Sequence, residues 1–141
     1  MSKVFIAVAR FYEDLANTMQ QGACARLEKA GIAYDIANVP GAFELPSALR
    51  MAIASGNYAG YIALGCVIRG ETTHYDYVCE ESARGLNDLA LQHLAPIGYG
   101  ILTVENEEQA WERAALDKGN KGADAAAACL IMMDLKQKFS L

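Results

Sequence analysis

Four short apolar runs, separated by segments with helical periodicity, constrain the fold of this chain more than any other feature. The runs cover residues 4–9, 34–39, 61–68 and 97–104, and three of them are largely uncharged. Uncharged runs of this length are typical of strands that are buried on both faces of a parallel sheet. Because strands that alternate with helices favour such a sheet, the pattern predicts an α/β fold with a four-stranded parallel sheet flanked by helices.

The segments between these runs carry helix signals. The first predicted helix begins near Glu13 and ends at a left-handed cap at Gly31, and its apolar stripe consists of Leu15, Met19, Ala23 and Leu27. Further helices are predicted over residues 43–55, 73–93 and 123–139, with a short one after residue 106.

Two of these helices are predicted to start at capping boxes. Thr73 with Asp76, and Asn106 with Gln109, have the required spacing of three residues. The glycine-containing segment 118–122 is expected to separate the last two helices.

Composition excludes several classes of protein. The 141 residues are 53% apolar and 21% charged, which excludes a disordered chain and predicts one domain over residues 1–141. The net charge of −5 and the lack of a basic cluster argue against a nucleic-acid partner. The longest uncharged stretch, residues 51–68, is interrupted by glycines, so we expect no membrane span.

The cysteines are scattered along the chain. Cys24, Cys66, Cys79 and Cys129 form no C-x-x-C pair and have no histidine at ligand spacing. We interpret them as free thiols in a reducing cytoplasm, and we expect neither a metal site nor disulfides.

The loops that follow the four runs hold more chemistry than simple connections need. They cover residues 10–12, 40–44, 69–74 and 105–106, and three of them combine a ring with a charged or titratable group. Because the carboxyl ends of parallel strands meet at one edge of a sheet, we expect a ligand site there.

The segment from Gly70 to His74 is the most informative of these loops. Glycine allows close approach of the backbone, and the amides that open the next helix can hold an anion such as phosphate. His74 would lie beside that anion and could donate or accept a proton near neutral pH. Spacing alone favours this interpretation no more than a plain helix cap with a solvated histidine.

Other candidate residues have equally plain alternatives. Phe11 and Phe43 could stack on a planar heterocycle or belong to the core, and Glu44 suits a helix start on dipole grounds alone. The remaining candidates are interpreted as structural: His93, Trp111, Tyr75 and Tyr77.

Taken together, these residues resemble the lumazine synthase family over nearly the whole chain. The motifs that carry the resemblance are Arg10-Phe11, Val39-Pro40-Gly41-Ala42-Phe43-Glu44-Leu45-Pro46, the run from Gly65 to Asp76, Thr103-Val104-Glu105-Asn106 and Gly119-Asn120-Lys121-Gly122. They occur in the family's order and spacing.

The resemblance implies a flavodoxin-like three-layer fold with the sheet order 2-1-3-4. It implies the condensation of 5-amino-6-ribitylaminouracil with 3,4-dihydroxy-2-butanone 4-phosphate to 6,7-dimethyl-8-ribityllumazine, the penultimate step of riboflavin biosynthesis. The family uses no metal and no organic cofactor.

The resemblance also assigns roles to individual residues. Phe11 would stack on the pyrimidine, and the ribityl chain would be held by Ala42, Phe43 and Glu44. The polar edge of the pyrimidine would meet backbone groups of Cys66, Val67 and Ile68. The amides of Glu71 and Thr72 would bind the phosphate, and His74 would transfer protons.

Three further residues would come from a neighbouring subunit. Arg113 corresponds to the family's phosphate-binding arginine, Lys121 to a lysine of the same site, and Tyr99 to a position commonly occupied by phenylalanine. The resemblance therefore implies a homopentamer, which in some members assembles into a larger shell. Tyr12 departs from the family, which often has asparagine there.

Two other functions stay open from the sequence. One is a catalytically weak oligomeric scaffold that binds a flavin or a lumazine. The other is a monomeric mononucleotide-binding module with the same fold.

Overall fold

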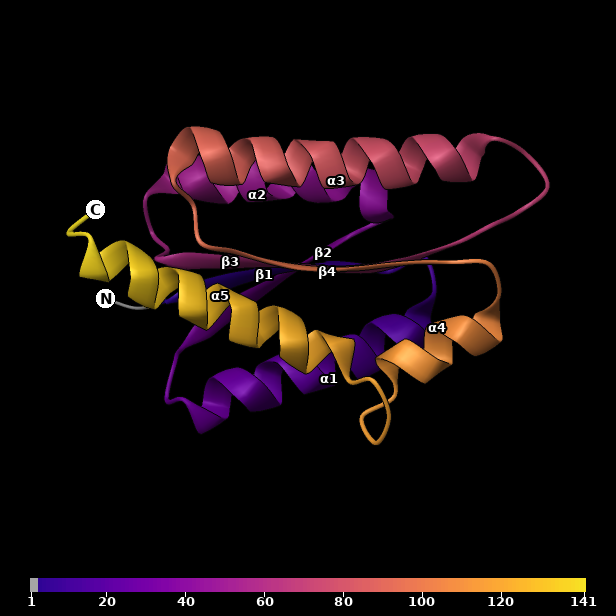
Figure 1. The fold of residues 1–141 in the computed structure, drawn as a ribbon, viewed down its shortest axis with the longest axis horizontal. Helices are drawn as coiled ribbons and strands as arrows, with labels where there is room; N and C mark the ends of the chain where they lie inside the picture. The colour runs from indigo at the N-terminus through magenta and orange to yellow at the C-terminus, as the bar shows by residue number, and fades with distance from the viewer. Residues whose placement is uncertain (1–2) are drawn as a thin grey trace.

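The computed structural model describes residues 3–141 and contains one parallel sheet with helices on both faces (Figure 1). The elements in chain order are β1 (Val4–Ala9), α1 (Glu13–Lys29), β2 (Tyr34–Val39), a 3-10 turn η1 (Ala42–Glu44), α2 (Leu45–Ser55), β3 (Gly60–Ile68), α3 (His74–His93), β4 (Ile97–Val104), α4 (Glu107–Ala114) and α5 (Lys121–Lys138). The strand order is β2-β1-β3-β4, and every pairing is parallel. The predicted fold class and sheet order are confirmed.

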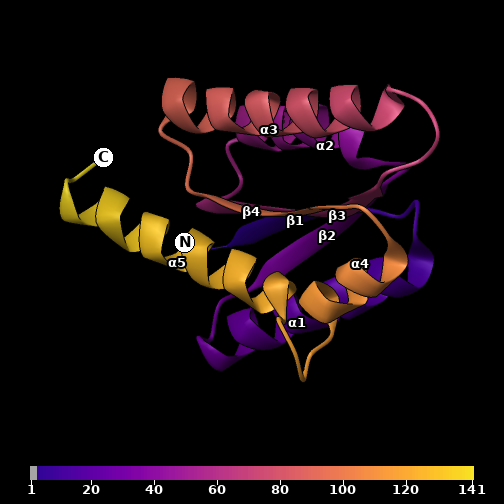
Figure 2. The same cartoon turned by 45° about the vertical axis from the view of Figure 1, so that its right-hand side comes forward.

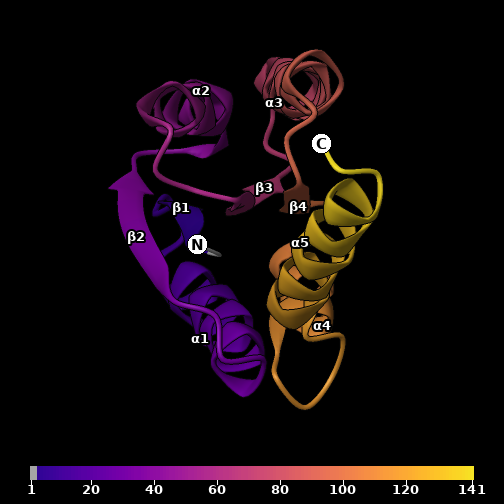
Figure 3. The ribbon, with the colours of Figure 1, turned by 90° about the vertical axis from the view of Figure 1, so that its left-hand side faces the viewer.

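The sheet separates two apolar cores. Figure 3 shows α2 and α3 on one face of the sheet and α1, α4 and α5 on the other. Along β1, Ile6 and Val8 pack into the core on the α1 and α5 side, whereas Ala7 and Ala9 pack into the core on the α2 and α3 side. Because successive side chains of a strand point to opposite faces, a run buried on both faces has to be apolar throughout.

Left-handed glycines end two helices where they were predicted. Gly31 has a φ of 72°, its N–H donates to the carbonyl of Glu28, and the next N–H donates to the carbonyl of Leu27. This pattern is a Schellman motif, which satisfies carbonyls that the helix leaves without partners. Gly56 has the same φ of 72° and ends α2.

The predicted helix starts are only partly correct. Thr73 makes no side-chain capping bond to α3, so that capping box is wrong. Asn106 does cap α4, accepting from the Gln109 N–H at 2.9 Å. The return bond differs, because the Gln109 side chain accepts from the N–H of Glu105 at 2.8 Å rather than from Asn106.

The last helix begins earlier than predicted. It starts at Lys121, so Gly122 belongs to its first turn rather than to the break before it. A Cβ atom at Gly122 would lie 2.1 Å from the carbonyl oxygen of Met19 on α1. The glycine is therefore needed for the close packing of α5 against α1, a contact between distant segments that local sequence does not reveal.

Within residues 3–141, no helix is both long enough and apolar enough to cross a membrane. All four cysteines are free thiols, and Cys66 and Cys129 are buried.

We expect the protein to lose stability as the pH rises above 9. Burial raises the pKa of both Cys66 and Cys129 from an ordinary value of 9.0 to about 12. Below pH 9 both thiols are neutral in the folded and in the unfolded chain. Above pH 9 these two thiols lose their protons only in the unfolded chain. Each thiol therefore lowers the free energy of unfolding by roughly 1.4 kcal/mol per pH unit.

Urea unfolding followed at pH 8 and at pH 10 measures this loss. The Cys129→Ala variant should be less stable at pH 8 because it leaves a small cavity, and it should lose less stability between the two pH values. Equal losses in the variant and the unchanged protein would contradict the expectation.

Candidate active site

The loops after β1, β2 and β3 form one pocket of about 480 Å³ at the carboxyl edge of the sheet. This volume suits a small molecule. The predicted site residues that line it are Phe11, Ala42, Phe43, Glu44, Cys66, Val67, Ile68, Thr72 and His74. Parallel pairing brings them together from three segments that lie far apart in the sequence.

The two phenylalanine rings at this pocket do not belong to the core. The side chain of Phe11 is 74% exposed and that of Phe43 is 58% exposed. The alternative that they are core residues is therefore wrong. Exposed aromatic rings at the mouth of a pocket provide surfaces on which a planar ligand can stack.

Glu44 closes the turn that carries Phe43. One oxygen of its carboxylate, Oε1, accepts from the Gly41 N–H at 3.0 Å. This bond fixes the short 3-10 turn, and Pro46 follows in the first turn of α2, where its missing N–H is tolerated. Glu44 is half-buried and lines the pocket, so this bond holds its carboxylate there.

His74 is the first residue of α3 and lies exposed on the pocket wall. The backbone N–H of His74 donates to Thr72 Oγ1 at 3.3 Å, while the Thr73 side chain makes no capping bond to the helix. The backbone amides at a helix N-terminus and the helix dipole favour an anion there. Glu71 lies in the same loop, exposed and outside the pocket wall.

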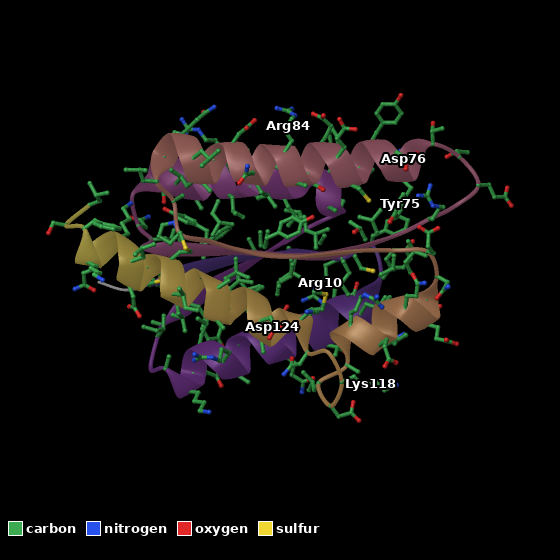
Figure 4. All side chains as sticks on the ribbon, in the orientation of Figure 1. Arg10, Tyr75, Asp76, Arg84, Lys118 and Asp124 are labelled. Atoms are coloured by element: carbon green, nitrogen blue, oxygen red, sulfur yellow. The ribbon has the colours of Figure 1, made fainter. Side chains whose placement is uncertain are left out.

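Arg69 connects this loop to the start of α3 and to the loop after β4. Its Nε donates to Glu105 Oε1 at 2.8 Å, its Nη1 donates to Asp76 Oδ1 at 3.4 Å, and its guanidinium lies 4.3 Å from the centre of the Tyr75 ring. Tyr75 extends from the start of α3 toward the sheet and lines the pocket (Figure 4). Sequence reasoning missed both residues, although an arginine directly after a buried strand was a usable signal.

Cys66 reaches the pocket as a neutral thiol. Burial raises the pKa of this thiol to about 12, so it is protonated at neutral pH and is a poor nucleophile. No group of three histidine, cysteine or carboxylate side chains within residues 3–141 is arranged to hold a metal ion. The groups that line the pocket are of kinds that can stack, accept hydrogen bonds, bind an anion and transfer a proton.

The other predicted site residues lie in a different pocket. Tyr99, Arg113 and Lys121 line a hollow of about 350 Å³ beside β4 and α5. Arg113 Nη1 donates to the backbone carbonyl of Gln109 at 3.0 Å, and Lys121 Nζ lies 3.4 Å from Asp124 Oδ2. Tyr99 is 46% exposed on the edge strand of the sheet. A single chain thus divides the predicted site into two separate surfaces.

A larger cavity, of about 600 Å³, lies at the opposite end of the sheet. It is lined by His93, Tyr58 and Tyr61 together with both apolar and polar residues of α5. His93 therefore contributes to a cavity wall rather than to the core. We place the active site in the smaller pocket because the strand-end loops bring a histidine, a carboxylate and two exposed rings together there.

Comparisons with known proteins agree with this geometry. Residues 1–137 match the family described as 6,7-dimethyl-8-ribityllumazine synthase. The enzyme of that name numbered 1 from Rhizobium meliloti (strain 1021) is 51% identical over 140 residues, which cover 96% of this chain and 92% of the relative.

Two further relatives carry the same name. The protein from Agrobacterium fabrum (strain C58 / ATCC 33970) is 50% identical over 145 residues, covering 98% of each chain. The protein from Bartonella tribocorum (strain CIP 105476 / IBS 506) is 52% identical over 137 residues, covering 96% of this chain and 91% of the relative. The chain therefore belongs to the 6,7-dimethyl-8-ribityllumazine synthase family.

Proposed function

We propose that this protein condenses 5-amino-6-ribitylaminouracil with 3,4-dihydroxy-2-butanone 4-phosphate in the pocket at the carboxyl edge of the sheet. The products are 6,7-dimethyl-8-ribityllumazine, inorganic phosphate and water. The observation that carries the proposal is the meeting of exposed rings, a held carboxylate and a histidine at a helix start around one pocket.

The pyrimidine would occupy the side of the pocket nearest β1 and β3. The exposed Phe11 ring would stack on its face, and backbone groups of Cys66, Val67 and Ile68 would pair with its polar edge. The ribityl chain would lie along Ala42 and Phe43 and donate hydroxyl hydrogen bonds to Glu44. Each contact matches one chemical feature of that substrate.

The phosphate of the second substrate would bind at the N-terminus of α3. The amides of Glu71 and Thr72 would donate to it, and His74 would lie beside it. The amine attacks the ketone carbon, and the oxygen leaves as water after it receives a proton. A later step removes a proton from carbon as phosphate departs. The ribityl-bearing nitrogen then attacks the remaining carbonyl carbon, and loss of a second water closes the new ring. His74 would deliver the proton to the departing oxygen and accept the proton removed from carbon.

We expect the His74→Ala variant to be slower than the unchanged enzyme by about 10²-fold in kcat, but still faster than the uncatalysed condensation. Activity persists because holding the two substrates in reactive orientation does not need the imidazole. Lumazine absorbance and phosphate release measure the rate. His93→Ala is the matched control, since that histidine lies in the cavity at the opposite end and its removal should leave kcat unchanged.

We also propose that the active form is a homopentamer, which could assemble into a larger shell. Tyr99, Arg113 and Lys121 would then complete the pocket of the adjacent chain, with the permanently charged fork of Arg113 binding the phosphate. An exposed groove between α3 and β4, lined by Leu86, Ile97 and Tyr99 among others, supports a subunit contact at this edge of the sheet.

Mixing two impaired variants tests the shared site. Arg113→Ala should mainly raise KM for the butanone phosphate, whereas the exposed and ion-paired Arg84 can be replaced by alanine as a control without effect. Chains carrying His74→Ala, unfolded and reassembled with an equal amount of Arg113→Ala chains, should form roughly a quarter of their sites with both native residues. Activity above the sum of the separate variants is expected. Activity equal to that sum contradicts a site shared between chains.

Two smaller proposals accompany these. The cytoplasm as the location is supported by the four free thiols. One domain spanning residues 1–141 is supported by the single sheet that both cores share. A catalytically weak flavin-binding scaffold is not favoured, because the family that matches and the relatives about 50% identical carry the name of the synthase.

A further inference from the structure

The Phe11 ring is oriented although most of its surface is open to solvent. It is 74% exposed, and its partner is the ring of Tyr12, whose centre lies 4.9 Å away at an interplanar angle of 84°. This is the edge-to-face geometry that aromatic pairs prefer. In such a pair an edge meets a face, so at least one face of Phe11 stays free for a planar ligand.

Tyr12, unlike Phe11, is held in place by contacts with the protein interior. Its half-buried ring packs against the core on the α1 side of the sheet, and burial raises the pKa of its hydroxyl. Tyr12 and Ile68, the last residue of β3, pack against the same core and both line the pocket. Tyr12 thus connects the exposed Phe11 ring to the packed interior beside the pocket.

The backbone on the other side of Phe11 is fixed by Arg10. This side chain lies between the sheet and α1 (Figure 4) and donates from Nε to Asn38 Oδ1 at 2.9 Å and from Nη1 to Glu13 Oε1 at 3.1 Å. It also donates to Asn17 and Gln20. With the backbone held in this way, the freedom left to Phe11 is rotation of its own side chain, which the Tyr12 ring restricts.

We propose that Tyr12 is a positioning residue that holds the Phe11 ring ready to stack on the pyrimidine substrate. This inference rests on the proposed function and deepens it. Ordering a freely rotating side chain on binding reduces affinity, and a ring that is already oriented avoids this loss.

Tyr12→Leu is the test variant, because leucine keeps an apolar side chain against the core and removes the ring. The Kd of 5-amino-6-ribitylaminouracil alone, measured by calorimetry, should rise about 3- to 10-fold, and KM for this substrate should rise with it. KM for the butanone phosphate should not change. Tyr12→Phe keeps the ring contact and should restore both constants to within about twofold of the unchanged protein.

A double-mutant cycle with Phe11→Ala shows whether Tyr12 acts through Phe11. In the Phe11→Ala background, Tyr12→Leu should cause no further rise in Kd, because the ring that Tyr12 holds is gone. Additive effects, or an equal rise in KM for both substrates, would assign Tyr12 a general structural role and overturn the proposal.

Two further measurements keep the outcomes distinct. If Tyr12→Leu fails to fold, NMR of the unchanged protein with selectively labelled phenylalanine decides the question. The Phe11 ring protons should show ring-current shifts from the Tyr12 ring, and Tyr12→Phe should retain these shifts. Absence of the shifts overturns the proposal. Unchanged protein that neither binds nor converts the pyrimidine overturns the proposed function as well. If the unchanged protein binds and converts the pyrimidine, and Tyr12→Leu has the same Kd and KM for it, only the positioning role of Tyr12 is overturned.

Discussion

Parallel pairing of all four strands is the constraint on which the site depends. It places the last residues of the strands in register, Ala9 beside Val39 and Ile68 beside Val104. The ladders continue one residue into the loops, since the Arg10 N–H donates to the Val39 carbonyl at 2.9 Å and the Arg69 N–H to the Val104 carbonyl at 3.0 Å. Figure 2 shows the strands enclosed between the two layers of helices. The loops that carry Phe11 and lead to His74 therefore leave the sheet from points that the buried strands determine.

Hydrogen bonds join the two halves of the proposed site within one chain. Arg69 binds Glu105, whose N–H donates to the Gln109 side chain at 2.8 Å, and Arg113 in turn donates to the Gln109 carbonyl at 3.0 Å. The loop that carries His74 is thereby connected to the helix that carries Arg113. In a ring of subunits, the geometry of a chain's own pocket and of the arginine that it contributes to its neighbour would depend on the same contacts.

The sequence predicts those parts of the molecule that local physics determines. Strand positions follow from apolar runs, and Gly31 and Gly56 end helices because a left-handed residue is needed there. Two predictions about helix starts were wrong. Gly122 lies inside α5, where it packs closely on α1, a contact that local sequence does not reveal. At α3 the neighbouring Thr72, not Thr73, accepts a backbone hydrogen bond at the start of the helix.

The same distinction applies to the site. Loop positions at strand ends follow from topology, so Phe11, Glu44 and His74 could be assigned to one edge before the structure was known. Side-chain partners could not, because spacing does not say that Arg69 lies over Tyr75 or that Tyr12 meets Phe11 edge to face. What sequence reasoning misses at this site is the set of residues that hold the ligand-contacting groups in place.

These holding residues matter more here than in an enzyme with a strong nucleophile. The thiol of Cys66 is kept neutral by burial, and the proposed roles of the other groups around the pocket are stacking, accepting hydrogen bonds, binding an anion and transferring a proton. Rate acceleration must then come largely from orienting two substrates, where small displacements are costly. In one chain the groups that would make these contacts, Phe11 and His74, are exposed. Their orientation therefore has to be fixed by neighbouring residues that are themselves held in place, such as Arg10, Tyr12 and Arg69.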